Sequence, residues 1–385
     1  MALGQGGHAN PVLLEDPEEG LFHVPRRVGP DVFRRICSLK PGQRMQDLPE
    51  ELWHRSFLFY VKHDPMRQGG PNLRMIRLDP DRPALTVTGY VFNKFVHPFQ
   101  DRFITPREAA RLQDIPDDFR FVGTLTSVQQ QVGNAVPVRL AAALARAVVE
   151  HAMDTSSLTG YADCANGWIP ALSLFTGIGG MDLGFGESAR RESGFGFRPL
   201  ACVELDQDCC ATLARNGFGD VTPTDITCIR SARQFLHRLA GEWSVPMVFG
   251  GPPCQAFSQA GKQKGTGDDR GRLIFEYARF IEELRPVYFV MENVSNLRGV
   301  AGGRLFNSIM DRFARSGYNV RVHRLCAADF GTPQLRVRLF FVGVEDKYPP
   351  VGAPTRSHGE LGELPLSVPT LRPYATVRDA FAGLP

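Results

Sequence analysis

The chain has 385 residues, of which 43% are hydrophobic and 22% charged, and its formal net charge is +3. These totals are typical of a soluble globular protein with one large and one small domain, so any basic surface for nucleic acid would have to be local. The eight cysteines form no C-x-x-C pair, so the sequence indicates neither a zinc site nor a thioredoxin-like motif, and we expect no metal.

The first part of the chain is irregular up to about residue 75. Arginines cluster within residues 26–35, where they either contact phosphates or form a solvated surface, and Val32, Phe33 and Ile36 indicate one short helix. Acidic residues stand where a signal peptide would be apolar, and no apolar run approaches the length of a membrane span. We therefore expect a cytoplasmic protein with reduced thiols and no membrane contact.

Two helices and a linker are predicted in the next part. Thr105-Pro106-Arg107-Glu108 has the pattern of a capping box with proline at the first helical position. Residues 131–137 predict a turn that leads into a second helix, on which apolar residues recur at four-residue spacing as far as Val148. Residues 151–168 lack periodicity and predict a linker.

Strands and helices then alternate. Short apolar runs predict strands at residues 169–175, 200–205, 247–249, 288–291 and 338–344. Residues 273–284 follow the helical template, and a last short helix is expected at 376–381. This alternation is typical of an α/β fold with a doubly wound, mostly parallel, Rossmann-like sheet.

The first of these strands runs into a glycine turn, residues 175–180. The dinucleotide fingerprint requires a third glycine at position 182, where this chain has Asp182, so phosphate binding is disfavoured and an uncharged or cationic nucleoside fits better. Glu204 ends the next strand and is placed to hold ribose hydroxyls. Asp225 follows the expected third strand and could hold an adenine amino group. Each acidic residue alone would more often be a cap or a surface charge.

A single cysteine, Cys254, follows the strand at 247–249 and precedes a polar, glycine-rich loop, which is where an α/β enzyme keeps a nucleophile. Glu292 ends the following strand, so the thiol and the carboxyl group are expected in one cleft, where they suit attack on an electron-poor ring. Arg336 and Arg338 alternate with apolar residues and are expected to share one strand face.

With these motifs the chain resembles the DNA (cytosine-5)-methyltransferase family over roughly residues 70–150 and 169–345. The matching motifs are Gly250 to Gln255 (Pro-Cys-Gln), Met291 to Val294 (Glu-Asn-Val), Gln334 to Arg338 (Gln-x-Arg-x-Arg), Phe175 to Gly180, and Gln131 to Pro137 (Gln-x-Gly-Asn-Ala-Val-Pro).

The resemblance implies S-adenosylmethionine as the cofactor and double-stranded DNA as the substrate. Cys254 would attack C6 of a flipped-out cytosine, Glu292 would contact N3 and the amino group, and Arg338, assisted by Arg336, would hold O2. The implied cofactor positions are Phe175, Gly177, Gly179, Gly180, Glu204, Leu205, Asp225, Ile226, Pro252, Leu273, Asn134 and Val136. The implied DNA contacts are Gln255, Ser258, Arg270 and Gln334.

One departure from the family is large, because the Gln-x-Gly-Asn-Ala-Val-Pro block precedes the cofactor loop instead of ending the chain. We therefore expect a circular permutation with 151–168 as the joining linker and 169–345 as the catalytic and cofactor domain. A smaller, irregular DNA-recognition domain would be split between residues 1–75 and the tail 346–385, and residues 76–150 would return the chain to the catalytic domain.

The sequence thus predicts a cytosine C5 methyltransferase of a bacterial restriction-modification system, or an orphan modification enzyme. We expect a monomer in the cytoplasm, associated with the nucleoid, with a possible cognate restriction endonuclease. The alternatives are an inactive relative that only docks on DNA, an RNA methyltransferase of the same fold, and a nicotinamide oxidoreductase. The intact Cys254, Glu292 and Arg338 oppose the first alternative, and Asp182 opposes the last.

Overall fold

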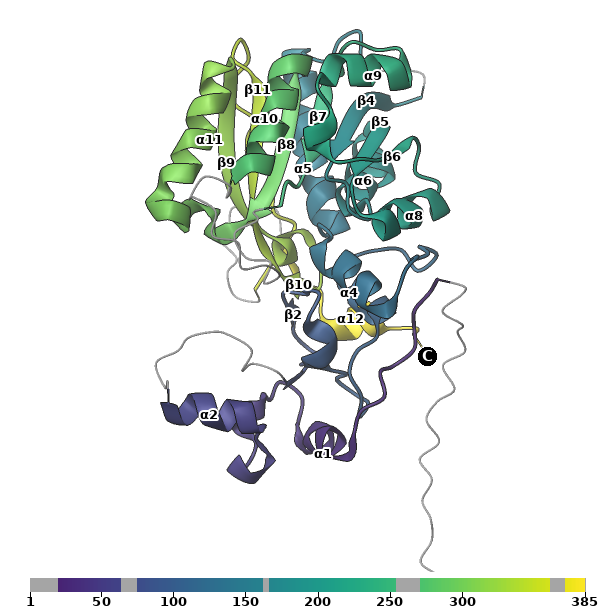
Figure 1. Ribbon diagram of the computed structural model, residues 1–385, viewed down its shortest axis with the longest axis vertical. Helices are drawn as coiled ribbons and strands as arrows, with labels where there is room; N and C mark the ends of the chain where they lie inside the picture. Colours follow the sequence, from purple (N-terminus) through teal and green to yellow (C-terminus); the bar gives the residue numbers. More distant parts are fainter. Residues whose placement is uncertain (1–19, 64–74, 162–165, 254–270, 361–370, 385) are drawn as a thin grey trace, which may run out of the picture.

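A computed structural model describes residues 20–63, 75–161, 166–253, 271–360 and 371–384. An α/β body forms one end of the molecule, and a smaller irregular part that carries α1 and α2 forms the other (Figure 1). Segments from both ends of the sequence meet in the region between them, where β2, β10, α4 and α12 lie.

The body is built on one seven-stranded sheet with the order β6-β5-β4-β7-β8-β11-β9. β11 pairs antiparallel with β8 and β9, and the remaining neighbours are parallel, which confirms the mostly parallel α/β sheet. The strands are β4 (Trp168–Leu174), β5 (Gly196–Glu204), β6 (Val221–Pro223), β7 (Met247–Gly250), β8 (Tyr288–Val294), β9 (Tyr318–Cys326) and β11 (Val337–Glu345).

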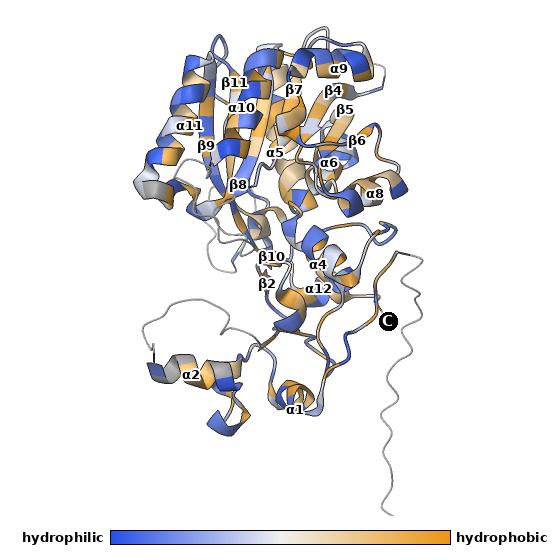
Figure 2. Cartoon of the chain, viewed as in Figure 1, coloured by the Kyte–Doolittle hydropathy of each residue, from blue (hydrophilic) through white to orange (hydrophobic). Residues whose placement is uncertain are grey.

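Helices cover both faces of this sheet, because most central strands are apolar on both sides. Figure 2 shows hydrophobic residues along the central strands and hydrophilic residues on the outer turns of the helices. One face packs against α5 (Val138–Thr155), α6 (Gly180–Leu183), η5 (Gly184–Ser188) and α7 (Ala189–Ser193). The other packs against α9 (Ala232–Ala240), α10 (Arg272–Leu284) and α11 (Arg304–Arg315), and α8 (Gln207–Arg215) lies beside β6.

The remaining elements are short and pack around two further apolar clusters. Before the sheet they are α1 (Pro30–Ser38), η2 (Met45–Asp47), η3 (Glu50–Leu52), α2 (Arg55–His63), β1 (Ile76–Arg77), β2 (Ala84–Leu85), η4 (Val91–Asn93), β3 (Phe95–Val96), α3 (Pro106–Arg111) and α4 (Leu125–Asn134). Within and after it they are η6 (Ile226–Cys228), η8 (Ser295–Gly303), η9 (Ala327–Phe330), β10 (Gln334–Leu335), β12 (His358–Gly359), β13 (Arg372–Pro373) and α12 (Val377–Phe381).

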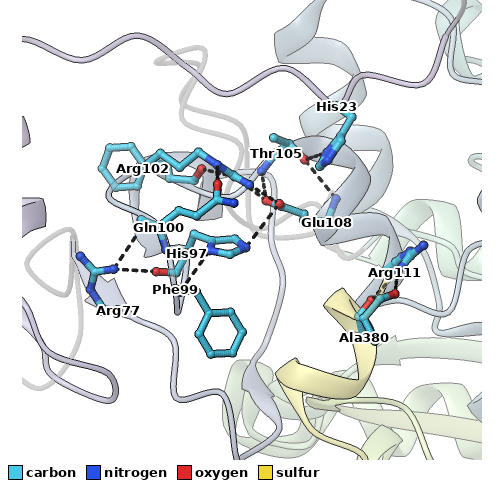
Figure 3. A network of polar contacts seen from close by, with 12 residues as sticks. His23, Arg77, His97, Phe99, Gln100, Arg102, Thr105, Glu108, Arg111 and Ala380 are labelled. Carbon is cyan, nitrogen blue, oxygen red and sulfur yellow. Dashed lines mark hydrogen bonds and ion pairs between the residues drawn. The ribbon is translucent and has the colours of Figure 1, made fainter. Parts of the chain in front are cut away.

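A largely buried polar network around α3 connects segments that are distant in the sequence and reaches α12 (Figure 3). The capping box of α3 is confirmed, and its Glu108 also accepts two hydrogen bonds from Arg102 at 2.6 and 2.9 Å. His97 lies 3.6 Å from Glu108 and stacks on Phe381 of α12, and burial lowers the pKa of His97 to about 4. Arg111 donates to the carbonyl oxygens of residues 380 and 382. The C-terminal helix is thereby attached to α3.

Three local features differ from the sequence-based expectations. Residues Gln131–Asn134 are the last turn of α4, so only residues 135–137 form the predicted turn. α5 continues to Thr155, five residues into the predicted linker. The helical stretch Leu125–Thr155 is long and apolar enough to cross a membrane, which the sequence analysis missed, but 78% of its most apolar window is buried in the protein. Its two helices, α4 and α5, therefore belong to the protein core.

Candidate active site

A cavity of about 1110 Å³ opens at the carboxyl ends of β4, β5, β7 and β8. In a parallel sheet this edge is where ligands bind, because loops and helix N-termini surround it. α4 and the connection to α5 form the opposite wall. Of the residues predicted for the cofactor, the cavity lining includes Asn134, Val136, Phe175, Gly177, Gly180, Glu204, Leu205, Asp225, Ile226, Pro252 and Leu273.

The glycine turn after β4 has a backbone that few residues adopt. Phe175, Gly177 and Gly179 have φ values of 53, 57 and 79°, all in the left-handed region. A Cβ at Gly180 would lie 2.5 Å from the carbonyl oxygen of Val136, whereas a Cβ at Gly177 would meet no atom within 4 Å. Gly180 therefore lets the α4–α5 connection approach the turn, and Gly177 leaves open space beside it. Gly179 is not part of the cavity lining and packs against Phe218 instead.

Glu204 is held in place by the backbone around it. Its Oε2 accepts from the N–H of Gly177 at 2.7 Å, and its Oε1 accepts from the N–H groups of Leu205 and Asp206 at 2.8 and 2.9 Å. The carboxylate therefore links the ends of β4 and β5 and keeps free lone pairs toward the cavity. Asp225 caps η6 through the N–H of Thr227, and this hydrogen bond lowers the pKa of Asp225.

The other end of the cavity contains the predicted catalytic carboxyl group. Burial raises the pKa of Glu292, and the nearby Arg338, whose Nε lies 3.0 Å from Glu292 Oε1, opposes this shift. A Cβ at Gly251 would lie 3.1 Å from Glu292 Oε2, so this carboxyl group faces the chain just before Cys254. The amide of Asn293 donates to the carbonyl oxygen of Pro252 at 3.0 Å and fixes that turn. Cys254, Gln255, Ser258 and Arg270 lie outside the described residues.

The structure corrects the interpretation of two residues. Gln334, expected to contact DNA, is fully buried, and its side chain hydrogen bonds to Val87, Leu112 and Gln113 occupy both ends of the amide. Arg336 is also buried and does not line the cavity itself: it donates to the carbonyl oxygens of Val87 and Gly133 at 2.7 and 3.0 Å, and its charge acts on Glu292 from behind the cavity wall.

Both corrections have the same cause. The sequence pattern indicated only that alternate residues share one strand face, whereas the side chains of Gln334 and Arg336 satisfy backbone groups where residues 84–89 pack against β10. Burial, with Arg338 nearby, lowers the pKa of Arg336 to about 9.

Sequence reasoning missed several residues of the cavity. The N-terminal half of α4 and its N-cap line it with Thr124, Thr126, Ser127 and Gln130. The sequence did not predict this helix because its residues are largely polar. Asp182 also lines the cavity, although the sequence analysis considered this residue only as a missing glycine. The N-cap pattern of Thr124, whose side chain accepts from Ser127 N–H, could have revealed α4.

This sheet, with a glycine turn and acidic residues at successive strand ends, defines an α/β enzyme of the methyltransferase fold. The family model of the C-5 cytosine-specific DNA methylases matches residues 47–150 and 169–372, so the chain belongs to that family.

Two curated relatives and one solved structure are similar to parts of this chain. The chain is 37% identical over 230 residues to the Type II methyltransferase M.AquIA of Picosynechococcus sp., which covers 56% of this chain and 88% of the relative. It is 36% identical over 218 residues to the Type II methyltransferase M1.HphI of Haemophilus parahaemolyticus, covering 56% of this chain and 52% of the relative. A crystal structure of a prophage-encoded DNA modification methyltransferase from E. coli aligns with 27% identity and a TM-score of 0.43, over 56% of this chain and 55% of that one.

Proposed function

We propose that this protein methylates C5 of cytosine in double-stranded DNA with S-adenosylmethionine. The observation that carries the proposal is the pairing of Glu292 with Arg338 at one end of a cavity whose other end is the glycine turn with Glu204. A carboxyl group whose pKa is raised by burial is suited to hold or donate a proton at a ring nitrogen.

The residues present fit the cofactor. Gly177 leaves room that a side chain would fill, and Glu204 and Asp225 present carboxylates at the ends of neighbouring strands, which suits ribose hydroxyls and an amino group. When bound, S-adenosylmethionine would supply an electrophilic methyl group. Phe175, Leu205, Ile226, Pro252, Leu273, Asn134 and Val136 would enclose it.

The chain's own residues would activate the base. The Cys254 thiolate would attack C6 of a flipped-out cytosine, and Glu292 would stabilise the proton at N3, so that C5 becomes nucleophilic. Arg338 would hold both the base O2 and the Glu292 carboxyl group, and Arg336 would position the strand that carries Arg338. After methyl transfer, loss of the C5 proton to a base would expel Cys254.

The circular permutation remains a proposal that two observations support. β10 pairs with β2, and Arg336 contacts residues 87 and 133, so segments about 200–250 residues apart form one unit. If two segments of the sequence have exchanged places, an alignment that keeps the residues in order can match only one of them. The two relatives above each match 56% of the chain, whereas the family model matches it in two segments on either side of residues 151–168.

The same proposal includes how the enzyme recognises DNA and where it acts in the cell. Residues 1–75 and 346–385 would form the DNA-recognition part, with Gln255, Ser258 and Arg270 of the loop after Cys254 against the DNA. The protein would act as a cytoplasmic, nucleoid-associated monomer within a restriction-modification system or as an orphan enzyme.

Covalent trapping tests the proposal. Duplex DNA that contains 5-fluorocytosine should form an irreversible adduct with the wild-type protein in the presence of S-adenosylmethionine, because fluorine cannot leave as a proton does. The adduct should map to Cys254, and Cys254→Ala should form none while still binding DNA. Single-stranded RNA of the same sequence serves as the competing acceptor. Methyl transfer to RNA alone, or an adduct at another cysteine, would overturn the proposal.

A further inference from the structure

Asp182 is a buried carboxyl group for which the described part of the chain provides no cation. Its residue is 5% exposed, and it lines the inner wall of the cavity from α6, just behind the glycine turn. Its Oδ1 lies 3.8 Å from the thiol of Cys202, and its Oδ2 has no hydrogen-bond partner among the described residues. No arginine, lysine or histidine of the described ranges forms an ion pair with it.

The elements packed against α6 add only neutral groups. β4 contributes the hydroxyl of Ser173, which hydrogen bonds to Asp182 and favours its ionised form, and which lies 3.0 Å from the hydroxyl of Thr176 at the start of the turn. β5 contributes Cys202, whose thiol pKa is raised by burial, then by Asp182 and, more weakly, by Asp220. α5 contributes small apolar residues. Burial raises the pKa of Asp182 to about 7, so near neutral pH this group responds to any nearby charge.

The other carboxylates of the cavity are already compensated. Glu204 accepts from three backbone N–H groups, Asp225 caps η6, Asp206 caps α8, and Glu292 pairs with Arg338. Asp208 also lines the cavity, but it is only half-buried. A positive charge that enters the cavity therefore gains most from Asp182, the buried carboxyl group with the weakest partners. Coulomb interactions are also stronger in a buried site than in water, so this group need not touch the ligand.

We propose that Asp182 makes the cavity favour the cationic sulfonium cofactor over its neutral demethylated product, S-adenosylhomocysteine. This rests on the proposed function, in which the cavity binds S-adenosylmethionine. The two ligands differ by one methyl group and one positive charge at sulfur, so a carboxylate stabilises only the first. By linkage, the bound cation promotes ionisation of Asp182 and binding releases a proton. Asp182 would thus help product leave and fresh cofactor enter.

Calorimetric titration of the full chain with each ligand tests this inference. The ratio of the S-adenosylhomocysteine Kd to the S-adenosylmethionine Kd should rise about five- to tenfold from about pH 5.5 to about pH 7.5, since Asp182 ionises more readily with the cation present. Titrations in buffers of different ionisation enthalpy should show proton release with S-adenosylmethionine that exceeds the release with the product.

Asp182→Asn keeps the shape of the side chain but cannot ionise, and it also corrects for titration of the ligands themselves. In this variant the Kd ratio should be independent of pH. Asp220→Asn, which removes the more distant carboxylate near Cys202, should behave as the wild type does. If Asp182→Asn does not fold, the inference is tested by the pH dependence of the wild-type Kd ratio and by the number of protons released when each ligand binds.

If both ligands bind the wild-type protein but the ratio of their Kd values does not change with pH, the role of Asp182 is overturned while the proposed function stands. An unchanged pH dependence in folded Asp182→Asn would do the same. Failure of both ligands to bind the folded wild-type protein would overturn the proposed function together with this inference.

Discussion

Replacement of Gln334 by leucine should destabilise the folded protein, because this side chain connects two distant parts of the chain. Its Oε1 accepts from Val87 N–H at 2.8 Å, and its Nε2 donates to the carbonyl oxygen of Leu112 and to Gln113 Oε1, both at 2.8 Å. Gln334 is fully buried, so water cannot replace these partners. Leucine has a similar volume but leaves all three groups unpaired.

The size of the effect follows from those three groups. Each buried polar group left without a partner costs about 1–3 kcal/mol, and the additional apolar carbon contributes about 1 kcal/mol in the opposite direction. We therefore expect the free energy of unfolding to fall by about 2–8 kcal/mol, a large part of the roughly 5–15 kcal/mol that domains possess. A residue that only contacted DNA would leave this free energy unchanged.

Urea unfolding followed by circular dichroism measures the change directly. Leu335→Gln is the matched control, because the neighbouring side chain is 40% exposed, and its substitution should change the free energy of unfolding by less than about 0.5 kcal/mol. A Gln334→Leu variant of wild-type stability that binds DNA weakly would restore the DNA-contact interpretation and refute this reasoning.

Three further predictions concern other positions. Asn293→Ala should keep cofactor affinity but lower the single-turnover rate roughly 10–100-fold, since its amide fixes the turn before Cys254; an unchanged rate would contradict this role. Burial raises the pKa of Asp114 to about 6, so the folded state binds this proton more tightly than the unfolded state and stability falls as pH rises from about 4 to about 6. The free energy of unfolding of Asp114→Asn, measured by urea titration, should therefore rise by up to about 3 kcal/mol relative to that of the wild type between these pH values. A difference between the two proteins that does not change with pH would show that Asp114 does not titrate in this way. A circularly permuted variant, in which residues 385 and 1 are joined by a linker and new termini are opened elsewhere, tests the region after α5. Its Tm should be higher with new termini at the exposed residues 159–160 than at Ser157, whose hydroxyl lies 2.5 Å from that of Tyr288. Equal Tm values would show that this contact does not contribute to stability.

The sheet could be predicted from the sequence wherever strands are apolar on both faces. β4, β7 and β8 were located within a few residues, and the motif residues at their ends line one cavity as expected. β9 was missed because histidine and arginine side chains interrupt its apolar residues at the edge of the sheet, where one face is partly exposed.

The buried polar residues could not be predicted in the same way. A glutamine or arginine in an alternating pattern normally faces solvent, and only contacts more than 200 residues away explain why Gln334 and Arg336 do not. The charge environment of Asp182 is likewise a property of packing, because nothing in its neighbouring residues indicates that no cation reaches it.

The parallel pair of β2 and β10 also has a consequence for biosynthesis. Ala84 pairs with Gln334, so the early strand emerges from the ribosome about 250 residues before the strand that completes it. At translation rates of about 5–20 residues per second this interval lasts roughly 10–50 s, during which the apolar residues beneath β2 lack their final partner. Cellular yield should therefore depend on chaperone capacity during synthesis more strongly than the stability of the finished protein would suggest.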